Sequence, residues 1–242
     1  MCTIIIAQHR VTGFPLVVGH DRDELVSRPW LAPARRPDAP GVLAPRDVQA
    51  GGIWIGVNDA GLVVAITNRF GARLDDSLPS RGRLGLRALA RQSAAAALAD
   101  VEAHLETQHY RGFNLVLADA QHVFVVSRDG PLAQRHDLGE GVHVVTSIHH
   151  VNAHETSSLS AVLERSARHG PETFGERLRH VMSDDTPLPS GVAVCKHLGR
   201  FATVCGSIVW VGPHGPTRFE QTAGPPCRTP FVDVPLDRTD DG

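Results

Sequence analysis

The sequence is poor in cysteine and in long apolar runs, and each scarcity excludes a class of protein. Only four cysteines occur, at positions 2, 195, 205 and 227, and none forms a C-x-x-C pair. Such spacing is typical neither of a metal-binding module nor of a disulfide-stapled secreted domain. No stretch approaches the roughly 18–20 apolar residues of a membrane span. The beginning of the chain lacks the basic start and long apolar core of a signal peptide. We therefore expect a cytoplasmic protein without a membrane span.

An excess of charge of one sign is also lacking. The 24 Lys and Arg residues nearly balance the 26 Asp and Glu residues, giving a formal net charge of −2. A global basic field that would attract nucleic acid is therefore absent, and we expect no nucleic-acid partner. A chain of 242 residues that is 42% hydrophobic suits a single globular domain. We expect that domain over residues 1–220 and a C-terminal tail over residues 221–242. The oligomeric state stays open.

The most informative residue that is present is Cys2, directly after the initiator methionine. A small second residue permits removal of Met1, which would leave a thiol and a free α-amine on one residue. The thiolate is a nucleophile, and the amine, with a reference pKa of about 7.7–8.0, can serve as its base. The alternative is that Cys2 is a small buried hydrophobic residue, as most free cysteines are.

A predicted hairpin brings charged residues next to Cys2. The apolar run 3–7 predicts a strand, and a turn near Gly13 returns the chain as a second strand over 15–18. The second strand leads into Asp21-Arg22-Asp23-Glu24, which by itself would be typical of a solvated turn. Joined to Cys2 by the hairpin, this run instead predicts a site that holds the amine and tunes the thiol.

The rest of the chain alternates hairpins with helices. Residues 27–50 are rich in proline and predict a long surface loop, which either borders a binding site or is a passive excursion. Asn68 ends a predicted strand and is either an oxyanion donor or a turn residue. The remaining predicted elements are hairpins 53–57/62–67, 112–119/122–127 and 203–212/218–220, a strand 141–146, a helix 84–104, and a helical zone 155–183 broken at Gly170-Pro171.

This order predicts two packed antiparallel sheets with helices outside. We expect the first four strands, near 2–7, 15–18, 53–57 and 62–67, to share one sheet, with helix 84–104 packed outside the two-sheet core. The predicted site is a cleft beside Cys2, bordered by the 27–50 loop.

Several short motifs, in order along residues 1–220, resemble the NRDE proteins, also called the transport and Golgi organisation protein 2 family. They are Met1-Cys2, Asp21-Arg22-Asp23-Glu24, Ser27-Arg28-Pro29, Gly51-Gly52-Ile53-Trp54-Ile55-Gly56, Thr67-Asn68, Ser80-Arg81-Gly82, Gly112-Phe113-Asn114-Leu115, Val194-Cys195-Lys196-His197, and Phe201-Ala202-Thr203-Val204-Cys205-Gly206-Ser207. The resemblance implies an α+β fold, a four-layer αββα sandwich of two antiparallel sheets like that of N-terminal-nucleophile hydrolases.

The resemblance extends more distantly to the bile salt hydrolase and penicillin V acylase group. Those amidases use an N-terminal cysteine, an aspartate after the second strand and asparagines near the oxyanion, which Cys2, Asp23 and Asn68 match. Three positions depart from these patterns. His20 stands where the acylases have an arginine, Ser147 where they have a second asparagine, and Asp21 where the NRDE motif has its asparagine.

Two functions of different classes follow. The first is an N-terminal cysteine hydrolase or acyl transferase acting on a small-molecule amide or ester, without metal or cofactor. Its predicted catalytic residues are Cys2, Arg22, Asp23 and Asn68, and its predicted substrate-binding residues are His20, Trp54, Arg69 and Ser147.

The alternative, carried by the resemblance, is a non-catalytic protein that binds and traffics haem or a lipid or acyl ligand. The chain has 14 histidines, and Cys195 lies two residues from His197. Cysteine or histidine could ligate haem iron, and structural zinc is the less favoured use of these residues.

Overall fold

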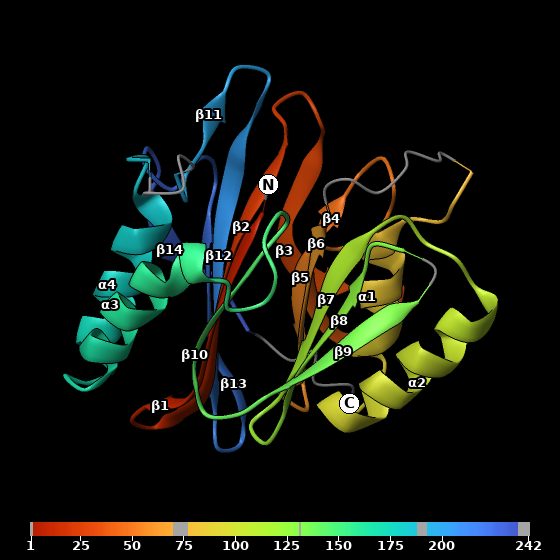
Figure 1. The fold of residues 1–242 in the computed structure, drawn as a ribbon, viewed down its shortest axis with the longest axis horizontal. Helices are drawn as coiled ribbons and strands as arrows, with labels where there is room; N and C mark the ends of the chain where they lie inside the picture. The colour runs from red at the N-terminus through yellow and green to blue at the C-terminus, as the bar shows by residue number, and fades with distance from the viewer. Residues whose placement is uncertain (1, 70–76, 131, 188–192, 237–242) are drawn as a thin grey trace.

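The structure is a computed structural model that describes residues 2–69, 77–130, 132–187 and 193–236. Its strands form two seven-stranded antiparallel sheets packed face to face. A pair of helices covers the outer face of each sheet (Figure 1). The layers are therefore helix, sheet, sheet, helix, and the predicted α+β fold, a four-layer αββα sandwich, is confirmed.

The first sheet has the order β10-β1-β2-β12-β13-β14, with β11 paired to β12. Its β1–β2 hairpin is the predicted one: Thr3 lies opposite Asp21, and Gly13 takes the positive φ of 83° that the turn requires. Its strands are β1 (Thr3–Val11), β2 (Phe14–Leu25), β10 (Gly141–Thr146), β11 (His197–Leu198), β12 (Phe201–Gly212), β13 (Gly215–Thr222) and β14 (Phe231–Asp233).

The second sheet runs in sequence order from β3 to β9, as expected for successive hairpins. The predicted hairpins near residues 53–67 and 112–127 are both present, as β5–β6 and β7–β8. Its strands are β3 (Trp30–Arg36), β4 (Ala39–Asp47), β5 (Ile55–Asn58), β6 (Val63–Asn68), β7 (Phe113–Ala118), β8 (Val123–Arg128) and β9 (Ala133–Leu138).

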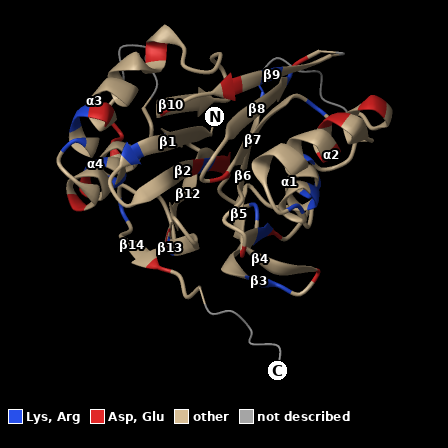
Figure 2. Cartoon of the chain, turned by 90° about the horizontal axis from the view of Figure 1, so that it is seen from below, with Lys and Arg blue, Asp and Glu red and all other residues tan. Residues whose placement is uncertain are grey.

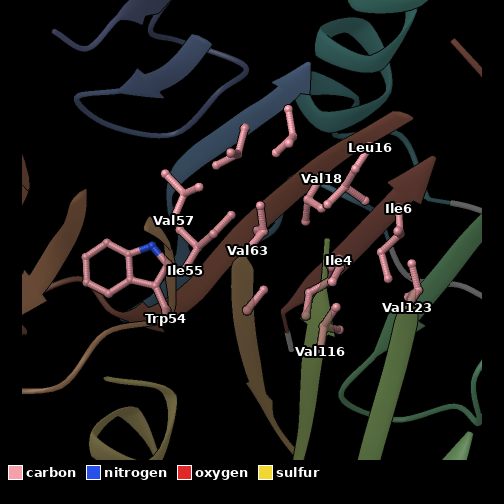
Figure 3. Packing of buried hydrophobic residues seen from close by; sticks show 14 of the residues in the cluster. Ile4, Ile6, Leu16, Val18, Trp54, Ile55, Val57, Val63, Val116 and Val123 are labelled. Atoms are coloured by element: carbon pink, nitrogen blue, oxygen red, sulfur yellow. The ribbon is translucent and has the colours of Figure 1, made fainter. Parts of the chain in front are cut away.

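Aliphatic residues that alternate along the strands fill the space between the sheets. Ile4 and Ile6 of β1 and Leu16 and Val18 of β2 face the second sheet, where residues such as Val63 meet them (Figure 3). The intervening residues of β1 and β2 pack instead against the helices of their own sheet. Both faces of the central strands are therefore buried, which explains the near-continuous apolar runs in the sequence.

Four α-helices and one 3₁₀ turn are present in the described part of the chain. The helices α1 (Arg81–Leu89) and α2 (Ala94–Thr107) cover the second sheet, and α3 (Ser157–Ala167) and α4 (Pro171–Ser183) cover the first. The 3₁₀ turn η1 (His154–Thr156) precedes α3. The predicted break at Gly170-Pro171 is confirmed. The single helix expected over 84–104 is wrong in one respect, because Ser93 caps a new helix by accepting a hydrogen bond from the Ala96 N–H at 3.2 Å.

Two predictions about the first seventy residues are wrong. The strands near 53–57 and 62–67 do not join the first sheet, because β10 and β12 occupy the two edges of the β1–β2 hairpin. Residues 27–50 are not a loop but mostly the hairpin β3–β4. Pro33 is tolerated because β3 is an edge strand and this residue lies at a register shift in the pairing with β4. Pro45 of β4 lies opposite the same shift, outside the two residues of β4 that pair with β5.

Part of the segment expected as a tail also belongs to a sheet. Strand β13 continues to Thr222, and Phe231 of β14 pairs with it. Residues 237–242 lie outside the described residues. Among the described residues, no helix combines the length and the apolar character that crossing a bilayer requires.

Candidate functional site

A cavity of about 260 Å³ opens where the first strand begins, and several predicted site residues line it. Cys2, Arg22, Asp23, Trp54 and Asn68 all contribute to its wall. They come from both sheets: Cys2 precedes β1, Arg22 and Asp23 lie on β2, Trp54 precedes β5, and Asn68 ends β6. Charged residues of both signs occur on both helix layers (Figure 2), so surface charge alone does not mark a site. This end of the sandwich differs because Arg22 and Asp23 are buried close to Cys2.

Two glycines set one wall of the cavity. A Cβ on Gly82 would lie 2.6 Å from the Ile53 carbonyl oxygen, and a Cβ on Gly52 would lie 2.6 Å from the backbone of Gly82. The Ile53 N–H donates to the Gly82 carbonyl at 3.2 Å. Only glycine permits this backbone-to-backbone approach. The start of α1 is thereby docked against the segment before β5, and Arg81 is placed in the cavity wall.

Cys2 is held by main-chain contacts on two sides. Its Sγ lies 3.4 Å from the Asp23 N–H, which donates to it, and 3.7 Å from the Asp23 carbonyl. The Cys2 carbonyl accepts a hydrogen bond from the Ser147 N–H at 3.2 Å. Burial raises the pKa of the Cys2 thiol above its usual value, and the charge of Asp23 adds to the rise. The thiol therefore needs a base if it is to attack a carbonyl near neutral pH.

The carboxylate of Asp23 is held by an ion pair that sequence reasoning missed. Lys196 Nζ lies 2.9 Å from Asp23 Oδ2, and the Thr203 hydroxyl donates to Asp23 Oδ1. Lys196 is only 4% exposed and is the sole lysine of the whole chain. All other Lys or Arg positions of the chain are arginine, so the single lysine was the feature of the sequence that could have indicated a specific role for Lys196.

Arg22 is fixed by a carboxylate and an aromatic ring. Its Nη2 donates to Asp47 Oδ2 at 2.8 Å, and its Cζ lies 4.2 Å from the centroid of the Trp54 ring. Arg28 Nε donates to the same Asp47 oxygen at 2.6 Å. Asp47 and Arg28, both cavity residues from the segment expected as a loop, were not predicted, because nothing local in the sequence pairs them with Arg22.

Arg81 is a further cation in the cavity wall, and its environment differs from that of Arg22 and Arg28. Its Nη1 donates to the Gly112 carbonyl at 2.8 Å, and no carboxylate lies within ion-pair distance of it among residues 2–69, 77–130, 132–187 and 193–236. Burial and the neighbouring charge of Arg111 lower the pKa of Arg81 to about 10. An anion brought to this guanidinium would stabilise its charged form and so offset the effects of burial and of Arg111.

Asn68 ends β6 with its side chain exposed at the cavity. Its backbone is in register with Phe113 of β7, and its amide group makes no hydrogen bond to another residue of the described ranges. The amide N–H₂ is therefore available to a group bound in the cavity.

Three predicted substrate-binding residues do not line the cavity. His20 is completely buried, and its Nε2 lies 3.2 Å from the Ile66 carbonyl, so that it bridges β2 and β6. Burial lowers the pKa of His20 to about 4. Arg69 donates to the His149 carbonyl at 3.0 Å and to Asp129 at 2.6 Å. Ser147 is 1% exposed and contacts the main chain of Cys2.

The comparisons with known proteins agree with this architecture. The Caenorhabditis elegans N-acylethanolamine-hydrolyzing acid amidase ortholog superposes with a TM-score of 0.56 at 15% identity, covering 88% of this chain and 93% of that one. A mutant of conjugated bile acid hydrolase from Clostridium perfringens gives 0.54 at 10% identity, covering 99% of this chain and 98% of that one. A second variant of the same hydrolase gives 0.56 at 10% identity, covering 98% of each chain. At these identities the likeness shows the fold, that of N-terminal-nucleophile hydrolases.

No curated protein matches the chain by sequence. The family model described as Transport and Golgi organisation 2 matches residues 1–215, from the initiator methionine to the first residue of β13. That match spans the motifs from Met1-Cys2 to the β12 segment and includes every residue of the cavity wall described above. The chain belongs to the Transport and Golgi organisation 2 family.

Proposed function

We propose that the protein is an N-terminal cysteine hydrolase or acyl transferase that acts on a small-molecule amide or ester. The observation that carries the proposal is the position of Cys2: its thiol lines the cavity and receives the Asp23 N–H, which would stabilise a thiolate. The fold shared with N-terminal-nucleophile hydrolases supports the same assignment at the level of architecture.

The reaction begins with removal of Met1, a residue outside the described part of the chain. While Met1 is present, the Cys2 nitrogen is an amide without a basic lone pair. Once free, the α-amine accepts the thiol proton, and Asp23, steadied by Lys196, favours the resulting ammonium. The raised pKa of the buried thiol makes such an internal base necessary.

The chemical step is nucleophilic acyl transfer. The thiolate of Cys2 forms a bond to the substrate carbonyl carbon, and the carbonyl electron pair moves to oxygen, where the Asn68 amide donates a hydrogen bond. Collapse of the tetrahedral intermediate expels the amine or alcohol, which takes the proton from the α-ammonium. The thioester left on Cys2 is then attacked by water, giving a free acid, or by an acceptor amine or alcohol, giving the transferred acyl product.

The substrate, on this proposal, carries an anionic group. Arg81 presents a guanidinium to the cavity without an ion-pair partner in the described ranges, whereas Arg22 and Arg28 share the carboxylate of Asp47 and Arg28 also pairs with Glu24. A carboxylate, sulfonate or phosphate placed a few bonds from the scissile carbonyl would accept bidentate hydrogen bonds from Arg81.

The first test uses a panel of acyl-amide and acyl-ester probes with intact-mass detection of an acylated chain. We expect an acyl adduct on Cys2 and turnover that Cys2→Ala abolishes, while Cys205→Ala, which removes another buried thiol, keeps both. Acylation that survives Cys2→Ala would contradict the proposal. The haem-carrier alternative predicts instead a Soret band on titration with haem that Cys2→Ala leaves unchanged.

The second test concerns the anionic group. Arg81→Gln should raise KM for an anionic probe by roughly 10–100-fold, since a hydrogen bond to a charged group is worth about 1.5–3 kcal/mol, and should leave a matched neutral probe unaffected. Arg83→Gln is the control, because Arg83 is an exposed arginine two residues further along α1. Equal losses on both probes would refute the anion subsite and leave the role of Cys2 intact.

A further inference from the structure

A second cluster of reactive side chains lies on segments that the cavity does not use. Cys195, His197 and Cys227 bring two sulfur atoms and one ring nitrogen within 4.8 Å of one another. His197 Nε2 and Cys227 Sγ are 3.1 Å apart. None of the three residues lines the cavity around Cys2. From this geometry we infer that the three side chains form a binding site for one zinc ion.

The donor set fits that ion. Thiolate and imidazole ligands suit zinc, and a tetrahedral ion bound at about 2.0–2.3 Å would separate its donor atoms by roughly 3.5–3.8 Å. The observed spacing therefore needs only small side-chain movements to accommodate a metal. Binding would release the thiol protons to solvent, because the ligands are the thiolates and the neutral imidazole.

The backbone that carries the ligands is anchored at each position. The Cys195 N–H donates to the Asp184 carbonyl at 3.0 Å, and His197 opens β11, paired with Ala202 of β12. Cys227 lies in a turn in which the N–H groups of Arg228 and Thr229 both donate to the Pro225 carbonyl. A site whose ligands are already placed loses little conformational entropy when the metal binds.

The three ligands differ in how deeply they are buried, and this difference shows which side of the site faces solvent. Cys195 is buried, Cys227 is half-buried and His197 is exposed, so that the sulfur side of the site faces the protein and the nitrogen side faces solvent. Three protein ligands leave the fourth position of a tetrahedral zinc for water or an exogenous donor. The ion would also fix the segment that carries Lys196, since this residue lies between two of the ligands in the sequence.

The experiment is zinc competition between the reduced full-length chain and a chromophoric chelator, with thermal unfolding of the same samples. We expect one zinc ion to bind per chain, and the midpoint temperature of unfolding to rise when zinc is added. His197→Ala and Cys227→Ser should weaken zinc binding at least tenfold and should abolish the zinc-dependent rise in the unfolding midpoint. Because His197 is exposed, His197→Ala is expected to fold, and circular dichroism without metal checks this.

The controls remove similar side chains elsewhere. His214→Ala, at an exposed position in the β12–β13 turn, and Cys2→Ser should both keep full zinc binding. Retention in Cys2→Ser separates this site from the proposed catalytic cysteine, so that either can fail without the other. A reduced wild-type chain that binds zinc no more tightly than Cys227→Ser would overturn the inference.

Discussion

The two halves of β2 are equally buried but chemically opposite. In the first half Leu16, Val17 and Val18 are at most 1% exposed and pack between the sheets or under the helices. In the second half the consecutive residues 20–23, His-Asp-Arg-Asp, are at most 4% exposed. One strand thus places an aliphatic core at one end and four ionisable side chains at the other.

The difference shows how stability and chemistry are separated along a single strand. Burying aliphatic groups stabilises the fold, whereas burying ionisable groups costs free energy unless each is paired or neutral. Arg22 and Asp23 are paired, with Asp47 and Lys196. His20 is kept neutral, and neither carboxylate oxygen of Asp21 has a hydrogen-bond partner among the described residues. The second half therefore depends on the first for its stability.

The largest expected stability effect comes from the aliphatic half. Leu16→Ala should lower the free energy of unfolding by about 2–5 kcal/mol, because Leu16 is fully buried between the sheets and its truncation leaves a void. Urea unfolding followed by circular dichroism measures this. Labelling of Cys2 in the folded fraction should be unchanged. A loss below about 1 kcal/mol would show that the first half does not supply the stability assigned to it.

The next largest expected effect is a pH dependence of the free energy of unfolding, which His20 introduces. Burial lowers the pKa of His20 to about 4. As the pH falls below about 6.5, His20 therefore takes up a proton in the unfolded chain but stays neutral in the folded chain. Stability should therefore fall as the pH drops from about 6.5 to about 4, by up to about 3 kcal/mol. His20→Gln should flatten this part of the pH profile of unfolding, and the exposed-site control His214→Gln should not. Identical slopes in both variants would contradict the account.

The smallest expected effect on the free energy of unfolding is a stabilisation, obtained by removing the buried carboxyl group of Asp21. Burial raises the pKa of Asp21 well above its ordinary value, with the charge of Asp23 contributing, so the folded chain holds a proton that the unfolded chain releases. This residue therefore costs stability increasingly as the pH rises above 3.8. Asp21→Asn should stabilise the protein by about 1 kcal/mol near neutral pH, and more under alkaline conditions. Asp185→Asn, at an exposed position, is the control. A destabilised Asp21→Asn chain would imply an uncharacterised partner for the carboxylate.

Local patterns in the sequence were sufficient for much of the fold. The β1–β2 turn at Gly13, the strand alternation and the break before Pro171 each have a local physical cause, and each is confirmed. The sheet membership of β5 and β6 was not predicted correctly, because β10 and β12 come from much later in the chain. The proline-rich hairpin β3–β4 was missed because its prolines are accepted only through the edge position of β3 and the irregular pairing around Pro33 and Pro45, which are set by the whole sheet.

The cavity was less predictable than the fold. Cys2 and the β2 residues lie together because a hairpin connects them, and Asn68 reaches the cavity by the packing of the two sheets. Tertiary contacts that no local pattern contains bring Arg81 into the cavity wall and Lys196 against Asp23. The Cys195–His197–Cys227 cluster was likewise not expected, because its third member lies thirty residues beyond His197.

The central claim is that Cys2 is a nucleophile activated by loss of Met1. Its most direct test is the rate of iodoacetamide labelling near neutral pH, followed by intact-mass and peptide analysis. Two preparations are compared: the processed chain, and a chain that keeps Met1 because the host aminopeptidase is inhibited. Cys205 serves as the internal reference, since burial raises the pKa of that thiol to about 12.

We predict that Cys2 of the processed chain reacts at least tenfold faster than Cys205 and at least tenfold faster than Cys2 of the chain that keeps Met1. Cys2 reacting at the same rate in both preparations, and no faster than Cys205, would contradict the claim.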